Sequence, residues 1–349
     1  MPRRIILPGM ISVYDIDGLA QWASRNGLDE TALKRFRIAF FKKALPVEDC
    51  LTTLPAGRRE AFRAAVSLPG LTLLTRQDSG LDGASKLSLR TTDGAVIETV
   101  ILRVASGRTS LCISSQVGCA ANCAFCATAK LGLARNLTRD EILDQVALAQ
   151  RLVRDEGRTI RNVVFMGMGE PLHNEKHVCA ALDTLRDPRA FYVADRHLMV
   201  STVGMVAAMA RFRERYPTVN LALSLHSARQ EVRKHLMPAG KSQTLERLRE
   251  VFPDAGHPYP LMVEYVLLKG VNDGPEDLAA LIDYLRGKEV HLNLIQFNPH
   301  PGSGFDPVSP TAREAFAKAL RKEGFKVTLR RSLGDDIAAA CGQLAGITR

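Results

Sequence analysis

The sequence predicts an α/β protein, in which a full or partial parallel barrel follows a small helical domain. Strand-like and helix-like segments alternate through roughly the last two thirds of the chain, whereas the first part shows only short helical patterns. Repeated strand–helix units imply parallel strands joined by right-handed crossovers. With 349 residues, the chain is long enough for two domains and for a core that needs no disulfide bonds.

Four short helices are expected in the first domain, which we place at residues 1–76. Gly27 and the Leu45-Pro46 pair interrupt the helical pattern, because glycine and proline end helices. The predicted helices cover residues 15–26, 30–42, 47–54 and 57–67.

A β-hairpin is expected to link the two domains, over residues 77–111. The dipeptide Asp93-Gly94 lies between two runs rich in strand-forming residues, and this dipeptide is a strong hairpin signal. The hairpin strands and the strand that follows them are predicted at residues 86–91, 96–103 and 109–114.

The second domain, residues 112–349, is predicted to form the barrel. Thr138 with Glu141, and Thr311 with Glu314, have the spacing of capping boxes that begin helices. In parallel barrels the reacting groups gather where the strands end, so we expect a site in the loops that follow them. The strands are predicted at residues 162–166, 197–202, 219–226, 261–268, 291–298 and 326–331.

The charge balance favours a polyanionic partner such as nucleic acid. Lys and Arg number 47 and Asp and Glu 37, which gives a net charge of +10. Residues 1–76 contain 12 Lys and Arg against 7 Asp and Glu, which is half of the excess in about a fifth of the chain. A basic surface that only keeps the protein soluble fits the same numbers.

We expect neither a membrane span nor a signal peptide. No apolar run approaches the roughly 18 residues that a membrane helix needs. Pro8 interrupts the short apolar stretch near the amino terminus, and no small-residue cleavage site follows it. The expected location is cytoplasmic.

Three of the seven cysteines form the motif Cys119-Ala-Ala-Asn-Cys123-Ala-Phe-Cys126. An odd number of cysteines without a secretory signal argues against a disulfide framework. Three thiolates without a nearby fourth ligand make a poor closed zinc site. They suit an iron–sulfur cluster that leaves one iron open to a ligand from outside the protein. Cys50 and Cys179 lie in predicted helices at apolar positions and are expected only to pack.

The motif, in the first strand–helix loop of the predicted barrel, resembles that of the radical SAM superfamily. The resemblance implies a partial (βα)6 barrel, a 4Fe-4S cluster on Cys119, Cys123 and Cys126, and S-adenosylmethionine (SAM) on the open iron. In that superfamily SAM is cleaved reductively to a 5′-deoxyadenosyl radical. Further stretches resemble the RlmN/Cfr family of RNA adenine methyltransferases, from about Gly94 to the carboxy terminus. These are Cys112-Ile-Ser-Ser-Gln-Val-Gly-Cys119, Arg135-Asn-Leu-Thr138, Gly167-Met-Gly-Glu-Pro171, Ser224-Leu-His226, Asn298-Pro299 and Gly334-Asp-Asp-Ile-Ala-Ala-Ala-Cys-Gly-Gln-Leu-Ala-Gly346.

The resemblance also implies roles for individual residues. Cys341 matches the cysteine that one SAM methylates; the radical from a second SAM then activates this methyl group, which adds to adenine. Cys112 matches the cysteine whose thiolate attacks Cys341, forming a transient disulfide and releasing methylated RNA. Glu98 matches the proposed proton acceptor. Contacts to SAM are implied for Gly169, Glu170, Ser201, Ser224, Leu225, His226 and Asn298.

The expected activity is methylation of adenine C2 in 23S ribosomal RNA, with transfer RNA as a further candidate substrate. Pro171 after Gly-Glu resembles the C2 branch, whereas Pro188 and Phe191 resemble the C8-specific branch, whose methylation confers antibiotic resistance. A non-catalytic iron–sulfur RNA-binding protein is a different-class alternative, and a zinc-binding RNA adaptor is another. The presence of both Cys112 and Cys341 argues against a mere binder. The expected partners are RNA and a reductant such as a flavodoxin, and the protein is expected to be a monomer.

Overall fold

A computed structural model of the protein describes residues 9–238 and 243–346. Residues 1–8, from which we argued against a signal peptide, lie outside the described residues. In the part of the chain that the structure describes, no helix has both the length and the apolar character needed to cross a membrane.

The amino-terminal helices begin where polar residues can cap them. Asp15 accepts a hydrogen bond from the Gly18 amide at the start of α1 (Ile16–Arg25), and Asp29 caps α2 (Glu30–Arg37) in the same way. These side chains satisfy amide groups that have no partner within the helix. The elements that follow are a π-helical turn (Ile38–Lys42), α3 (Val47–Thr52) and α4 (Ala56–Ala65).

Two short strands close the helical domain. β1 (Ile11–Ser12) pairs in parallel with β2 (Val66–Ser67). We predicted a last helix that reaches residue 67, but α4 ends at Ala65 because β2 takes the next two residues into strand pairing. Inside the domain, the Phe36 and Phe62 rings lie 4.7 Å apart, so aromatic packing joins α2 to α4.

One sheet runs through the rest of the described chain. Its ten strands follow the order β14-β13-β12-β11-β10-β9-β6-β5-β4-β3. Neighbours are parallel from β6 to β14, and β5, β4 and β3 continue the sheet in antiparallel pairs. The outermost strands of this described sheet do not pair with each other, so the barrel is partial, as the resemblance implies. The strands are β3 (Thr72–Asp78), β4 (Ala84–Arg90), β5 (Val96–Arg103), β6 (Thr109–Cys112), β9 (Ile160–Phe165), β10 (Leu198–Thr202), β11 (Asn220–Ser224), β12 (Leu261–Leu267), β13 (Val290–Gln296) and β14 (Lys326–Arg330).

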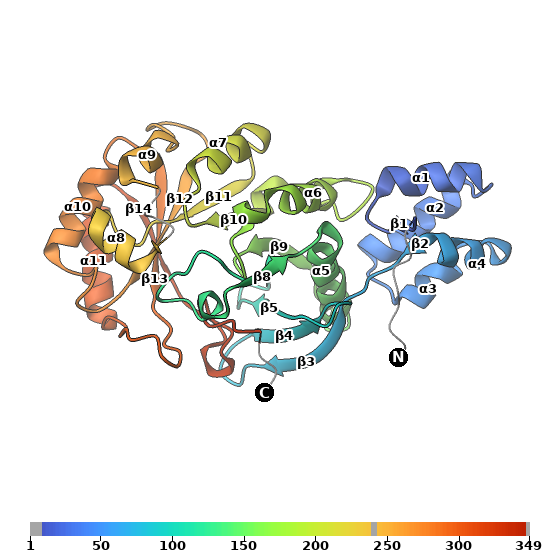
Figure 1. Ribbon diagram of the computed structural model, residues 1–349, viewed down its shortest axis with the longest axis horizontal. Coiled ribbons are helices and arrows are strands. Elements are labelled where there is room, and N and C mark those ends of the chain that lie inside the picture. The colour runs from blue at the N-terminus through green and yellow to red at the C-terminus, as the bar shows by residue number, and fades with distance from the viewer. Residues whose placement is uncertain (1–8, 239–242, 347–349) are drawn as a thin grey trace.

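Helices connect the parallel strands and lie along the outside of the curved sheet (Figure 1). The capping box of Thr138 and Glu141 is present at the start of α5. The capping box predicted at Thr311 is wrong, because α11 begins one residue earlier, at Pro310, and Ser309 caps it. The helices are α5 (Arg139–Arg154), α6 (Glu175–Arg186), α7 (Val206–Arg215), α8 (Gln230–Leu236), α9 (Leu245–Glu250), α10 (Pro275–Leu285) and α11 (Pro310–Lys322).

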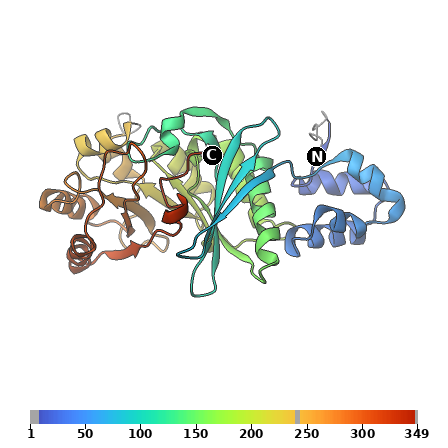
Figure 2. The same cartoon turned by 90° about the horizontal axis from the view of Figure 1, so that it is seen from below.

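The strand β3 was not predicted. Most of its side chains are exposed or half-buried, since it lies at the edge of the sheet, so it lacks the apolar alternation that indicates a strand. The boundary that we placed between residues 76 and 77 falls inside β3, and the linking segment is therefore an antiparallel extension of the main sheet. In Figure 2 these antiparallel strands stand between the barrel and the helical domain.

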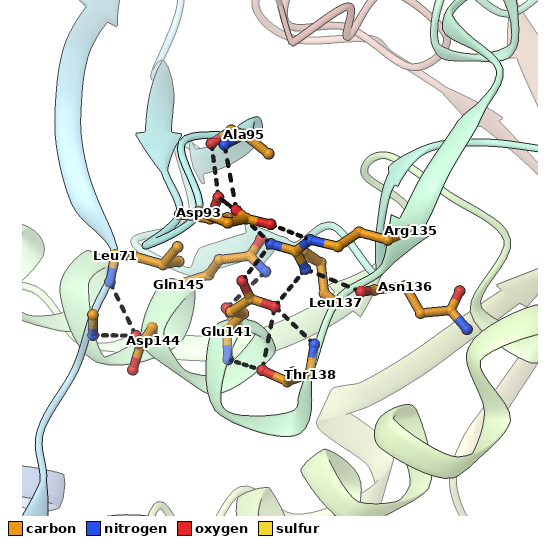
Figure 3. Close-up of polar contacts among 12 residues, drawn as sticks. Leu71, Asp93, Ala95, Arg135, Asn136, Leu137, Thr138, Glu141, Asp144 and Gln145 are labelled. Atoms are coloured by element: carbon orange, nitrogen blue, oxygen red, sulfur yellow. Dashed lines mark hydrogen bonds and ion pairs between the residues drawn. The ribbon is translucent and has the colours of Figure 1, made fainter. Parts of the chain in front are cut away.

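A buried carboxylate joins the two parts of the molecule. Asp144 of α5 accepts hydrogen bonds from the Tyr14 hydroxyl at 2.7 Å and from the amides of Gly70 and Leu71 at 2.7 and 3.1 Å. Figure 3 shows this carboxylate beside Leu71. Burial raises the pKa of Asp144 to about 6. One side chain thus ties the helical domain and the connection to β3 to the first barrel helix.

Candidate active site

A cavity of about 400 Å³ lies at the carboxyl ends of the parallel strands. Loops and strand ends from β6, β9, β10, β11 and β13 contribute to its wall. Active sites of parallel barrels lie at this end of the strands. The cavity brings together most of the residues singled out from the sequence. Those that line it are Cys112, Cys119, Cys123, Cys126, Gly169, Glu170, Ser201, Ser224, His226, Asn298 and Cys341. Leu225 and Glu98 are buried but are not part of the lining.

The loop with three cysteines is held by backbone contacts at both ends. It begins after β7 (Gln116–Gly118), where Gly118 has φ +76° and a Cβ atom would meet the Gly132 carbonyl at 1.8 Å. The Cys119 amide donates to that same carbonyl at 2.8 Å. Beyond the loop, β8 (Leu133–Asn136) pairs with β7, so the loop is closed like a hairpin.

An arginine anchors the far side of this loop. Arg135 of β8 donates to Glu141 at 2.7 Å and to Asp93 in the turn after β4, also at 2.7 Å (Figure 3). The arginine holds the pKa of the Asp93 carboxyl well below its usual range. Because Glu141 also completes the capping box of α5, the cysteine loop, the sheet and the first barrel helix are fixed to one another.

The three thiols of the loop suit an iron–sulfur cluster better than a single ion. Burial raises the pKa of Cys119 to about 11; burial also raises that of Cys123 well above its usual value, with the neighbouring Cys126 and Cys119 adding to the effect. Within residues 9–238 and 243–346, however, no group of three or more His, Cys, Asp or Glu side chains is arranged to hold a metal ion. A cluster takes its thiolates at separate irons, and its positive charge would offset the cost of burying them. The donor set therefore fits.

Glu170 faces the same cavity and is held from both sides. Its two carboxylate oxygens accept hydrogen bonds from the amides of Leu172 and Val203, at 2.9 and 2.8 Å. Burial raises its pKa to about 7, so a cation in the cavity would favour the charged form. The preceding Gly169 has φ +102°, and a Cβ atom there would lie 2.6 Å from the Gln116 side chain.

His226 is neutral, and one of its ring nitrogens accepts a hydrogen bond from the backbone of β12. Its Nδ1 accepts a hydrogen bond from the Val266 amide at 3.1 Å, which places the proton on Nε2. Burial lowers its pKa to about 3, and Arg233 contributes to the shift. The ring lies edge-on to Phe125 of the cysteine loop at 4.7 Å. The geometry makes His226 a hydrogen-bond donor at the cavity wall, not an acid or base.

Cys112 and Cys341 are more than 220 positions apart in the sequence and meet at this cavity. Burial raises the pKa of Cys112 to about 12, and the nearby Cys341 adds to the rise, whereas Arg330 lowers it. Cys341 also makes the largest contribution to a rise in the pKa of Arg330. All seven cysteines lie in the described part of the chain and are free thiols, so the structure contains no disulfide between them. Cys50 and Cys179 are buried elsewhere, in α3 and α6.

Sequence reasoning missed four charged residues of the cavity wall, Arg108, Glu264, Arg330 and Arg331, and two of them, Arg330 and Glu264, lie close together. Arg330, at the end of β14, lies 3.8 Å from a carboxylate oxygen of Glu264 and 3.4 Å from the Met166 sulfur. That Glu264 oxygen is buried and has no hydrogen-bond partner among the described residues. A glutamate in the middle of an apolar strand was the signal that could have found this pair, because a charge there needs a partner.

The segment that carries Cys341 is fastened to the sheet by Glu98. One oxygen of this carboxylate accepts hydrogen bonds from the amides of Ala345 and Gly346, at 2.8 and 3.1 Å, and the other lies 3.5 Å from the Lys86 ammonium. The Asn298 amide donates to the Cys341 carbonyl at 3.1 Å. Glu98 thus holds the position of the segment that carries Cys341, and it does not itself reach the cavity lining.

Comparison with known proteins first defines the class. Residues 113–285, which contain the cysteine motif and most of the parallel strands, match the radical SAM superfamily. A crystal structure of a radical SAM methyltransferase from Sphaerobacter thermophilus is 34% identical and has a TM-score of 0.91, covering 97% of this chain and 100% of that one. The fold is therefore that of a radical SAM methyltransferase.

Curated relatives then define the family. A "Probable RNA methyltransferase" of Rhodopirellula baltica is 45% identical, over 97% of this chain and 88% of its own length. The dual-specificity RNA methyltransferase RlmN of Syntrophobacter fumaroxidans is 37% identical, over 97% of this chain and 98% of its own length. The chain belongs to the RlmN family of radical SAM RNA methyltransferases, and it is an enzyme of that kind.

Proposed function

We propose that this enzyme methylates C2 of an adenine in 23S ribosomal RNA, and that transfer RNA is a second substrate. The observation that carries the proposal is the meeting of Cys112 and Cys341 at the cavity that the three-cysteine loop lines. Such a convergence of distant cysteines would have no use in a protein that only binds RNA. The free cysteines suit the reducing cytoplasm, where we place the enzyme.

The cofactors of this proposal are one 4Fe-4S cluster, held by Cys119, Cys123 and Cys126, and SAM. When bound and reduced by an external donor such as a flavodoxin, they supply a radical that can take a hydrogen atom from a methyl group. A cation beside Glu170 would keep its carboxylate charged, so Glu170 suits the ammonium group of SAM. The neighbouring Gly169 leaves room for a close approach. The polar contacts for the rest of SAM come from Ser201, Ser224, His226 and Asn298, with the buried Leu225 behind them.

The two distal cysteines divide the work. Cys341 carries the methyl group that is transferred to the base. Cys112 then attacks the Cys341 sulfur as a thiolate, so that a disulfide forms as the sulfur–carbon bond to the base breaks, and the released carbon takes up a proton to become the methyl group of the product. A thiol with a pKa of about 12 is a poor nucleophile at neutral pH, so Cys112 needs a cation. Arg330 is the nearby cation that favours its thiolate. Glu98 stays the proposed proton acceptor, and because it is engaged with Ala345 and Gly346, that role requires the segment to move.

The helical domain that precedes β3 is proposed to bind the RNA backbone. Lys34, Arg35, Lys42 and Lys43 are exposed, and none of these four forms an ion pair within the described structure. Exposed cations without an ion-pair partner can neutralise phosphates, which is the main source of affinity for nucleic acid.

Replacing these four cations by alanine is expected to weaken RNA binding and to flatten its salt dependence. Each lost phosphate contact should reduce the slope of log K against log salt by about one unit. RNA affinity measured at several salt concentrations checks this, and SAM cleavage in the absence of RNA should not change. The double variant Lys318→Ala/Lys322→Ala, on the exposed face of α11, is the control. An unaltered slope in the fourfold variant would mean that the charge serves only solubility.

Mass spectrometry of ribosomal and transfer RNA from cells with and without the gene tests the proposed function. We expect one adenine to lose a methyl group on C2 when the gene is removed, and purified enzyme to restore it. A methyl group on C8 would assign the enzyme to the other branch of the family. RNA that is identical in both cells would contradict the proposal.

A further inference from the structure

Tyr192 is an exposed aromatic side chain in a backbone conformation that such residues rarely adopt. It lies in the loop between α6 and β10, its φ is +59°, and 67% of its surface is exposed. A bulky residue in the left-handed region is strained, and such strain persists only where neighbouring contacts impose it. Neither apolar burial nor local backbone preference explains why a tyrosine stands at this position.

The contacts that impose this conformation come from the helical domain. Phe191 is buried and packs against Phe41, with ring centres 5.0 Å apart, and against Tyr14 at 6.2 Å. Arg189 forms an ion pair with Asp17 of α1 at 2.8 Å. The loop is therefore fastened to the other domain with Phe191 pointing inward, and the next side chain, Tyr192, is left on the surface of the junction.

A lysine of the helical domain lies over the exposed ring. The Lys42 ammonium is 5.1 Å from the centre of the Tyr192 ring, within the range of a cation–π contact. Lys42 is the last residue of the π-helical turn Ile38–Lys42, a local irregularity of the kind that often occurs at functional sites. Lys43 follows it in the chain and is also exposed, so a second cation lies one residue from the lysine that covers the ring.

We propose that Tyr192 and Lys42 form a platform on which an unpaired RNA base stacks, while Lys42 and Lys43 contact the flanking phosphates. Single-stranded RNA is recognised by this combination of an aromatic face with adjacent cations. The cations favour RNA over a protein partner. This inference rests on the proposed function, because it takes RNA as the substrate, and it adds a contact site at the junction between the helical domain and the barrel.

The platform is remote from the chemistry. Tyr192 precedes β10, so it lies at the end of the parallel strands opposite to the cavity, which is at their carboxyl ends. It therefore holds a part of the RNA other than the target adenine. Losing it should raise KM for RNA and leave kcat at saturating RNA unchanged.

The test compares variants of the full-length, cluster-loaded enzyme on transcribed 23S ribosomal RNA. Tyr192→Gly removes the ring and suits the left-handed backbone, so it should fold at least as well as the wild type. We expect KM and Kd for RNA to rise about tenfold in this variant. Tyr192→Trp should retain near-normal affinity, since it keeps a stacking surface. The control is Tyr259→Ala, which removes another exposed tyrosine, in a loop that lies before β12.

The results separate this inference from the proposed function. Wild-type RNA binding and methylation, with a selective rise in KM for Tyr192→Gly, would support both. An unchanged RNA affinity in Tyr192→Gly, with the wild type still active, would overturn the platform alone and leave the exposed ring to a protein partner. Failure of the wild type to bind or methylate RNA would overturn both.

Discussion

Replacing Cys112 by alanine is expected to leave the enzyme covalently attached to RNA, whereas replacing Cys341 by alanine is expected to give neither product nor adduct. In the proposed mechanism Cys341 acts before the carbon–carbon bond forms, so without its sulfur there is no methyl carrier. Cys112 acts afterwards, and without its thiolate the RNA stays joined to Cys341. The adduct should survive denaturation, because a carbon–sulfur bond holds it. Denaturing gels with labelled RNA distinguish the two variants.

Several observations make this comparison well controlled. Both cysteines line one cavity, and each substitution removes a single small side chain. Cys179→Ala is the matched control, because Cys179 is buried in α6 away from the cavity and should leave methylation intact. Cys112→Ser, which keeps the size of the side chain, should accumulate the same adduct. If neither Cys112 variant holds RNA, the division of labour between the two cysteines is wrong.

Replacing Cys123 by alanine is expected to abolish both SAM cleavage and the brown colour of anaerobically purified protein. Three thiolates are the only protein ligands that the proposed cluster has, so losing one removes a third of its attachment. Iron content, the absorption spectrum and the formation of 5′-deoxyadenosine measure the effect, which should be complete. Cys50→Ala, with its cysteine buried in α3, should retain all three properties.

The same preparations test the zinc alternative. A zinc protein is colourless, and its metal content would be zinc and not iron. Full iron content with normal 5′-deoxyadenosine formation in Cys123→Ala would contradict the assignment of the cluster to this loop. In each case, circular dichroism shows whether the variant has folded.

Local patterns in the sequence predict most of the fold and part of the site. Strand and helix patterns identify the barrel strands to within a few residues, because a strand that is covered on both faces, such as β12, is a short apolar run bounded by loop residues. The spacing of Cys119, Cys123 and Cys126 indicates a cluster site, because all three ligands lie in one short loop. Where a local signal is absent or ambiguous, prediction fails. The exposed edge strand β3 was missed, and Ser309 takes the capping role that was predicted for Thr311.

Short stretches of sequence account for the alternation of strands and helices, the cysteine loop and the basic amino-terminal helices, since each depends on residues that are close together in the chain. Contacts between distant residues are visible only in the folded protein. It brings Cys341 to Cys112, sets Arg330 beside Glu264, and places Glu98 against Ala345 and Gly346. It also leaves Tyr192 beneath Lys42. These contacts join separate elements, and their geometry follows from how the sheet curves and the domains pack, which no short stretch of sequence encodes.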